Sequence, residues 1–240
     1  MIERDNMLKN EKVEKILSKN KYNFDDLCLI MEVLRGEGGC PWDTEQTHES
    51  IRKNFIEETY EVIEAIDNKD SYLLREELGD VLLQVVFHTQ MEREAGNFDI
   101  DDVANDVCAK LVHRHPHIFG DVTASTADEV LSNWEAIKNV EKSRETTYDK
   151  LISIPSMTPA LMRAEKVAKK SGEYKEISNA DIINELDNII ESIKARDSKI
   201  TDGDMAEMLF LLSAIASKND IDAEESLFKK TNSFIEKFKE

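Results

Sequence analysis

The sequence predicts an all-α protein built from antiparallel helices, and three observations support this class. Glycine and proline are scarce, with eight and four among 240 residues, and long stretches contain neither. Apolar residues recur at helical spacing, as at Leu27, Ile30, Met31 and Leu34, and no strand-like alternation of apolar and polar residues persists. Forty per cent of the residues are hydrophobic, which is enough to bury a core in one large or two small domains.

In the first half, the expected helices follow a polar, mostly helical lead over residues 1–20 and span residues 25–34, 47–67, 71–95, 100–113 and 128–145. Segments rich in glycine or proline, including RGEGGCPWD and HPHIFGDVTAS, separate them as loops. Ser71 is the expected N-cap of the third helix, because a serine hydroxyl accepts a hydrogen bond from a free backbone N–H. The short DNKD turn makes the second and third helices antiparallel neighbours.

In the second half, residues 146–160 hold two of the four prolines, in SIPSMTPA, and we expect this segment to link two parts of the chain. ALMRAEKVAKK is a basic helical segment, best explained as a solvated helix face. Three more helices are expected over residues 181–195, 202–217 and 223–239. The predicted organisation is an N-terminal extension over residues 1–23, a first domain over 24–150, a linker helix over 151–175 and a second repeat over 176–240.

The formal charge of -19 restricts the partners of this chain. An acidic surface repels nucleic acid backbones and anionic membranes, so direct nucleic-acid binding is not expected.

Three distant cysteines give neither a C-x-x-C motif nor a disulfide framework. The N-terminal sequence lacks an apolar signal core, and the apolar runs are too short for a bilayer. We therefore expect a cytoplasmic protein without a membrane segment. The acidic surface allows a small polyanionic substrate only if a metal cation mediates its binding.

Carboxylates stand inside two apolar stretches, EETYEVIEAI and EELGDVLLQVVFH. Glu58 and Glu61 are three residues apart on one predicted helix, and Glu77 and Asp80 are three apart on the next. Each pair shares a helix face, and antiparallel packing lets the pairs converge. Four carboxylates would repel one another unless a divalent cation binds, and oxygen ligands favour Mg²⁺, Mn²⁺ or Ca²⁺ over Zn²⁺. The alternative, a solvated acidic face, fits the first pair better than the second.

Other candidate residues follow the acids. Lys110 and Arg114, four residues apart, are a candidate phosphate clamp, with an ordinary surface pair as the alternative. Trp42 and Trp134 are each either a core residue or a stacking partner for a nucleobase. The histidines of HRHPH are expected in loop and capping roles. A ferritin-like di-iron site is disfavoured, because it needs two E-x-x-H motifs and the chain has one.

The acidic pattern recurs later in the chain. Residues 54–66 align with residues 181–193, a shift of 127 positions, and residues 77–83 align with 204–210 at the same shift. We interpret this as a duplication, two similar amphipathic helix pairs being the alternative. The aligned acidic residues are Glu58 with Glu185, Glu64 with Glu191, Glu77 with Asp204, and Asp80 with Glu207.

The second copy departs from the first at two acids. Asn184 and Asn188 stand where the first copy has Glu57 and Glu61. We therefore expect the second copy to bind metal weakly or not at all, and to be structural or regulatory.

Five blocks of sequence, in order, resemble the MazG family of nucleoside triphosphate pyrophosphohydrolases: GGCPWDTEQTHESI, EETYEVIEAI, ELGDVLLQVVFHTQM, KLVHRHPHIFGD and EVLSNWEAIK. The resemblance covers roughly residues 24–172. It implies tandem all-α helical-bundle domains assembled as a homodimer, with the catalytic domain over 24–150 and a degenerate repeat over 176–240. It also implies hydrolysis of an NTP or dNTP to the monophosphate and pyrophosphate, by metal-activated water attack at the α-phosphate.

The resemblance also implies roles for residues. Glu58, Glu61, Glu77 and Asp80 would ligate Mg²⁺, with Mn²⁺ as an alternative, and Glu57 would help the attacking water. The expected catalytic residues are Glu57, Glu58 and Glu61, and the expected substrate-binding residues are Lys110, Arg114 and Trp134. A non-catalytic regulator that senses nucleotides or binds proteins with the same fold is the alternative function, and Mg²⁺-dependent pyrophosphate release separates the two.

Overall fold

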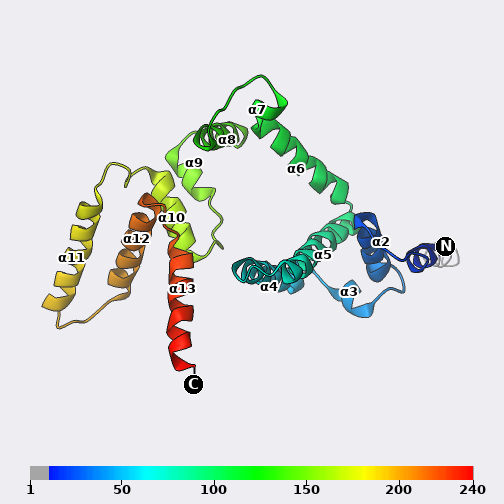
Figure 1. Ribbon diagram of the computed structural model, residues 1–240, viewed down its shortest axis with the longest axis horizontal. Coiled ribbons are helices and arrows are strands. Elements are labelled where there is room, and N and C mark those ends of the chain that lie inside the picture. The colour runs from blue at the N-terminus through cyan, green and yellow to red at the C-terminus, as the bar shows by residue number, and fades with distance from the viewer. Residues whose placement is uncertain (1–10, 240) are drawn as a thin grey trace. The chain divides into compact units, whose positions relative to one another are not determined.

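The computed structural model describes residues 11–239, and within this range the chain consists of helices and connecting segments (Figure 1). This confirms the all-α class. Residues 11–17 are helical, and the earlier part of the expected N-terminal lead lies outside the described residues. The further helices are α2 (Phe24–Arg35), α3 (Pro41–Glu45), α4 (His48–Asp67), α5 (Ser71–Ala95), α6 (Ile100–Arg114), α7 (Pro116–Phe119), α8 (Ala127–Glu141), α9 (Thr147–Ile152), α10 (Ala160–Ser171), α11 (Asn179–Ala195), α12 (Asp202–Lys218), α13 (Ala223–Ile235) and the 3-10 turn η1 (Glu236–Phe238).

The chain separates into two compact helical units, with the boundary between Gly120 and Asp121. This division follows contacts, whereas the domain limits expected from the sequence follow motifs and remain a prediction. No helix of the described residues combines the length and apolarity needed to cross a membrane. The three cysteines are free thiols, as their spacing predicted.

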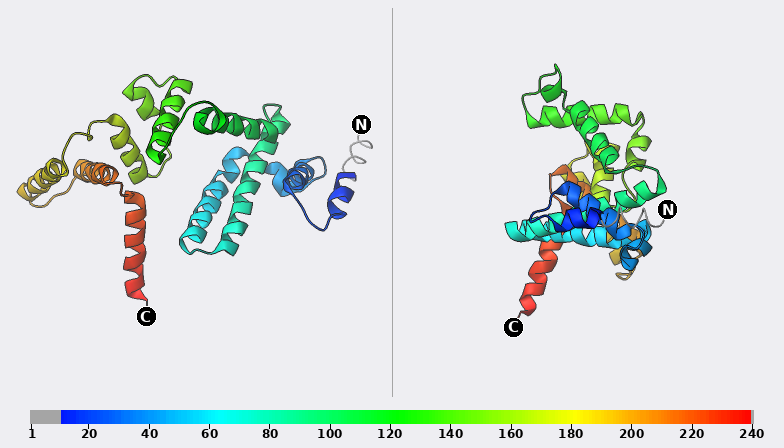
Figure 2. Two further views of the ribbon diagram at one scale, coloured as in Figure 1. Left: turned by 45° about the horizontal axis from the view of Figure 1, so that its top comes forward. Right: turned by 90° about the vertical axis from the view of Figure 1, so that its right-hand side faces the viewer.

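The first unit is organised around α5. Helices α4 and α5 pack along each other as an antiparallel pair, and α2 lies against α5 as well (Figures 1 and 2). The apolar faces of these three helices meet in one buried core cluster, whose residues are Met31, Ile51, Val86, Phe87 and Met91. Burying aliphatic and aromatic side chains removes apolar surface from water, and this stabilises the arrangement of α4 on α5.

The connection between α4 and α5 differs in one detail from the prediction. The N-cap of α5 is Asp70, whose carboxylate accepts hydrogen bonds from the backbone N–H groups of Tyr72 and Leu73, both at 3.0 Å. Ser71, the predicted N-cap, is the first helical residue. Both residue types can cap a helix, but the negative charge of Asp70 also interacts favourably with the positive end of the helix dipole.

Three short helices form in segments that the sequence predicted as loops or as a link. Helices α3 and α7 each begin with a proline, Pro41 and Pro116, whose fixed backbone angle suits the first helical position. Helix α9 lies in the expected linking segment and begins at a capping box formed by Thr146 and Asp149. Helix α8 ends at Glu141 rather than near residue 145, and Ser143 follows with a positive φ of 50°.

The second unit is organised around α10 and α12, which pack against each other. Helix α11 forms an antiparallel hairpin with α12, and both α9 and α13 contact α10. The buried apolar residues of this unit are Ile154, Ala168, Ile182, Ile193, Leu211, Ala214 and Ala216. The hairpin of α11 and α12 occupies the positions that align with α4 and α5 in the sequence repeat.

Candidate functional site

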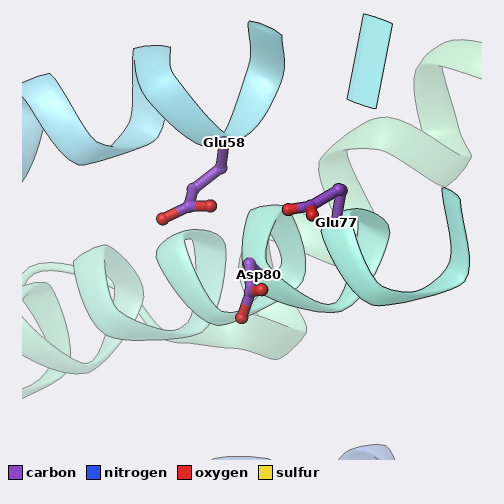
Figure 3. A group of neighbouring side chains, drawn as sticks. All are labelled: Glu58, Glu77 and Asp80. Atoms are coloured by element: carbon purple, nitrogen blue, oxygen red, sulfur yellow. The ribbon is translucent and has the colours of Figure 1, made fainter. Parts of the chain in front are cut away.

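Three carboxylates from α4 and α5 converge in the first unit. One oxygen atom from each of Glu58, Glu77 and Asp80 lies within 4.8 Å of the others. Figure 3 shows Glu58 extending from α4 toward α5, where Glu77 and Asp80 lie on successive turns. The spacing of three residues on α5 and the antiparallel direction of α4 bring these side chains together.

Glu61, the fourth predicted ligand, is exposed and lies beside Glu77, outside the three carboxylates whose oxygens lie within 4.8 Å of one another. Glu77 is only 8% exposed, and its pKa is raised by burial, by a hydrogen bond with Glu61, and by the charges of Glu61, Asp80 and Glu76. The pKa of Glu58 is raised by burial and by the charges of Asp80, Glu61 and Glu57. Among the described residues, the charged neighbours that shift these two pKa values are all acids, so they add to the negative charge around Glu58 and Glu77 and do not offset it.

The chemistry of this group fits a divalent cation. Its donors are carboxylate oxygens alone, and such donors suit Mg²⁺ or Mn²⁺ better than Zn²⁺. Burial in an apolar helix pair would be unfavourable for so many acids without a positive partner. We refer to Glu58, Glu61, Glu77 and Asp80 as the acidic cluster.

Glu57 lies beside the acidic cluster and is engaged elsewhere. Its Oε1 atom is 3.1 Å from the Nζ atom of Lys53, one turn earlier on α4. Both side chains are exposed, and an exposed ion pair of this kind contributes at most about 1 kcal/mol. The pair can therefore open at little cost.

Lys110 and Arg114 share a face of α6, but their surroundings differ. Lys110 is exposed, whereas Arg114 is 5% exposed. Helix α6 starts beyond the C-terminal end of α5 and does not run back along it (Figure 1). The distance along α5 from Asp80 to Ala95 is about 22 Å at 1.5 Å per residue. The first unit therefore does not bring these two cations next to the acidic cluster.

The two tryptophans occupy different units. Trp42 is exposed on α3 in the first unit, and Trp134 is half-buried on α8 in the second. The structure thus brings Glu58, Glu77 and Asp80 together and carries the predicted substrate-binding residues on other helices.

Sequence reasoning missed two polar features on the α4-facing side of α5. The Nδ1 atoms of His48 and His88 are 2.7 Å apart, their rings stack, and the Nε2 atom of His48 is 2.7 Å from Glu92. This network ties the first turn of α4 to the second half of α5. The other feature is Gln84, a buried amide one turn after Asp80. The D-x-x-x-Q spacing could have placed Gln84 on the same helix face as Asp80. No sequence pattern predicted the contact between His48 and His88, which are forty residues apart.

The aligned acids of the second repeat have other partners. Asp204 forms a capping box with Thr201 and an ion pair of 2.7 Å with Arg196. These hydrogen bonds, the one from Thr201 first, lower the pKa of Asp204 to about 2. Glu191 pairs with Lys194 at 2.8 Å. Among residues 11–239, the acidic group of the first unit is the one in which three potential metal ligands lie this close together.

A shift in helix start explains the difference between the repeats. Asp204 aligns with Glu77, but it is the third residue of α12, whereas Glu77 is the seventh residue of α5. A carboxylate in the first turn of a helix can bond backward to the capping residue. The aligned position therefore caps a helix in the second repeat and joins an acidic cluster in the first.

Comparisons with known proteins agree with this geometry. A sequence model of the MazG nucleotide pyrophosphohydrolase domain matches residues 46–119, which include the acidic cluster. The nucleoside triphosphate pyrophosphohydrolase/pyrophosphatase MazG of Thermotoga maritima is 37% identical over 219 residues, which are 90% of this chain and 84% of that protein. The chain belongs to the MazG family.

Other relatives support membership of the MazG family. The nucleoside triphosphate pyrophosphohydrolase of Escherichia coli K12 is 38% identical over 226 residues, covering 90% of this chain and 86% of that protein. YabN, an uncharacterized protein of Bacillus subtilis, is 46% identical over 159 residues, covering 66% of this chain and 32% of that protein. The resemblance carried by the five sequence blocks is confirmed.

We predict that Mg²⁺ or Mn²⁺ stabilises the protein through the acidic cluster. A ligand at 100 times its dissociation constant adds about 2.7 kcal/mol, or roughly 5–10 °C in Tm for a chain of this size. Glu77→Gln should lose most of this increment, whereas Glu64→Gln, on the exposed side of α4, should keep it. Thermal unfolding with and without the cation measures the difference, and an equal increment in both variants would contradict the prediction.

We also predict a pH-dependent role for Asp204 in stability. Because its pKa is lowered to about 2 from 3.8, the stabilisation is complete above about pH 4 and is lost as the pH falls toward 2. Asp204→Asn should therefore lower Tm at pH 7, and the difference from the parent should shrink below pH 4. Circular dichroism melts across this range measure it, with the exposed Asp202→Asn as control. A difference independent of pH would show that the charge of Asp204 is not responsible.

Proposed function

We propose that this chain hydrolyses nucleoside triphosphates or deoxynucleoside triphosphates to the monophosphate and pyrophosphate. The observation that carries the proposal is the convergence of Glu58, Glu77 and Asp80, with Glu61 beside Glu77, inside the segment that matches a pyrophosphohydrolase domain. The relatives from Thermotoga maritima and Escherichia coli, similar over 90% of this chain, are named for nucleoside triphosphate pyrophosphohydrolase activity.

The acidic cluster is the proposed site of Mg²⁺, with Mn²⁺ as the alternative. The cation, when bound, would act as a Lewis acid toward the phosphate oxygens and lower the pKa of water. The protein itself holds the four carboxylates in place through the packing of α4 on α5. A substrate with three or four negative charges would otherwise be repelled by this surface.

The proposed reaction is attack by water at the α-phosphate. The oxygen of water forms a bond to the α-phosphorus, and the bond from that phosphorus to the bridging oxygen of the β-phosphate breaks. Glu57, adjacent to the cluster and held by a weak exposed pair, is our candidate for orienting the water and accepting its proton. The family resemblance alone assigns Lys110 and Arg114 to the leaving pyrophosphate and Trp134 to the base, since the first unit by itself does not bring the two cations next to the acidic cluster.

We further propose that the chain forms a homodimer through the outer face of α4. Ile51, Glu58 and Ala65, spaced by seven residues, lie on the side of α4 that packs on α5. Ile56, Tyr60 and Ile63 share the opposite side, and all three are exposed, Tyr60 by 57%. An exposed row of large apolar side chains is typical of an interface. A second copy would cover it and complete a four-helix arrangement.

The central prediction is that pyrophosphate release depends on the first repeat. Incubation with a panel of NTPs and dNTPs should yield monophosphate and pyrophosphate with Mg²⁺ and nothing with EDTA. Glu58→Ala should reduce kcat/KM by at least about 100-fold, because it removes a ligand of the acidic cluster, while the aligned Glu185→Ala should leave it within about twofold. Chromatography of the products measures both.

Other outcomes would reject parts of this proposal. Diphosphate and inorganic phosphate as products would mean that the wrong bond is broken. Loss of turnover in Glu185→Ala but not in Glu58→Ala would move the active site to the second repeat. Cation-dependent nucleotide binding without turnover would favour the regulator over the enzyme.

The homodimer makes a separate prediction. Ile63→Lys should convert a dimer to a monomer, because it places a charge in the centre of the apolar row. Light scattering after size-exclusion chromatography measures the mass, with Ile152→Lys, an equally drastic change at an exposed position of the second unit, as control. A dimer that persists in Ile63→Lys would exclude this face.

A further inference from the structure

Gln84 is a buried residue whose side-chain oxygen has no partner among the described residues. Its side chain is 7% exposed, and its Oε1 atom is fully buried and has no hydrogen-bond partner among the described residues. Buried carbonyl oxygens in folded proteins are almost always paired with protein groups or with ordered water, because leaving them unpaired is unfavourable. The position of Gln84 therefore calls for a ligand atom.

Helix geometry places Gln84 on the same face of α5 as the acidic cluster. Gln84 follows Glu77 by seven residues and Asp80 by four. At 100° per residue, the three side chains fall within an arc of about 60°. The apolar core against α2 uses another part of the helix surface, which includes Leu83 and Val86.

Contacts on either side show that this face of α5 meets α4. One turn before Gln84, Asp80 lies beside Glu58. One turn after Gln84, the ring centroid of His88 lies 5.9 Å from that of Phe55. In Figure 3 the carboxylates follow one another along α5 in the order Glu77, Asp80, Glu58, so that Glu58 lies on the side of Asp80 away from Glu77.

The polar groups on the far side of Gln84 are already paired. The Nδ1 atom of His88 is bonded to His48, and His48 is bonded to Glu92. The acidic cluster, in contrast, carries uncompensated charge and would bring a hydrated cation to the side of Asp80 and Glu58. A hydrated cation has water hydrogens that need acceptors, which is what an unpaired amide oxygen supplies.

We propose that Gln84 is a positioning residue of the cation site. Its Oε1 atom accepts a hydrogen bond from a water that stays on the cation held by the acidic cluster. A neutral amide fulfils this role without adding a fifth negative charge to the group. The inference rests on the proposed function only in assuming that the acidic cluster holds a divalent cation.

The test measures cation binding without nucleotide. Gln84→Met keeps the length of the side chain and removes the acceptor, and Gln90→Met makes the same change at a half-buried position of α5 that bonds Glu94 and faces away from the cluster. Loss of a hydrogen-bonding partner of this kind typically weakens metal binding by 10- to 100-fold. Titration calorimetry with Mn²⁺ should show at least about tenfold weaker binding for Gln84→Met and no change for Gln90→Met.

Stability without cation provides the second readout. Because the Gln84 oxygen has no partner within residues 11–239, Gln84→Met in EDTA should unfold at the same temperature as the parent or a higher one. Higher stability together with weaker Mn²⁺ binding would support the inference, since a purely structural residue would not give both. Mn²⁺ affinity within twofold of the parent, or equal losses in both variants, would overturn it.

A second variant, Gln84→Asn, tests the inference in case Gln84→Met does not fold. Measurements of activity then distinguish this inference from the proposed function. Gln84→Asn retains the amide but withdraws it by one methylene, so it should weaken Mn²⁺ binding less than Gln84→Met and raise the Mg²⁺ concentration needed for half-maximal kcat. An unchanged Mg²⁺ requirement would overturn the inference even if the enzyme hydrolyses NTPs. A parent that binds Mn²⁺ tightly but releases no pyrophosphate would overturn the proposed function alone.

Discussion

Repulsion among the carboxylates between α4 and α5 is the constraint on which the rest of this structure depends. Four acids share a small and partly buried space, so the two helices must be held together by other contacts. The core cluster formed by α2, α4 and α5 supplies them, and the short capped turn at Asp70 fixes the antiparallel direction. Packing on one flank of α5 thus stabilises an arrangement on the other flank that would be unfavourable by itself. This arrangement suits a cation-binding site. A bound cation would remove the repulsion among the carboxylates, which the packing of the core must otherwise offset.

The sequence predicted the helices and the acidic cluster because both follow short-range rules. Helical periodicity located α4 and α5, and a spacing of three residues on each predicted which acids share a face. Other features depended on interactions that periodicity does not encode. Lys110 and Arg114 have equivalent spacing yet differ in burial, since spacing within a helix says nothing about what lies outside it. The stacking of His48 on His88 joins positions forty residues apart, and the short helices α3 and α7 arise from prolines that also fit a loop.

The two repeats show how one pattern of residues acquires different uses. Both hairpins are antiparallel and carry acids at aligned positions, but α12 begins later relative to the alignment than α5 does. In the first repeat the aligned acid is Glu77, which is buried in the second turn of α5 and repels the neighbouring carboxylates. In the second repeat Asp204 lies at the start of α12. Its carboxylate forms an ion pair with Arg196 and a capping box with Thr201. The register of a helix relative to its cap therefore decides whether a carboxylate adds to stability or requires a cation.

That difference in register limits what evolution can do with the second hairpin. Replacing Asn184 and Asn188 by glutamate would restore the number of acids found in the first copy, but Asp204 would remain engaged with Arg196 and with its own helix end. Recovery of an acidic cluster would also require a longer α12 and a new residue to cap it, and each intermediate would lose a stabilising contact before gaining a ligand. The capping box between Thr201 and Asp204 therefore makes this change difficult to reverse. Once an acid of a duplicated site stabilises a helix end, selection for stability preserves it there.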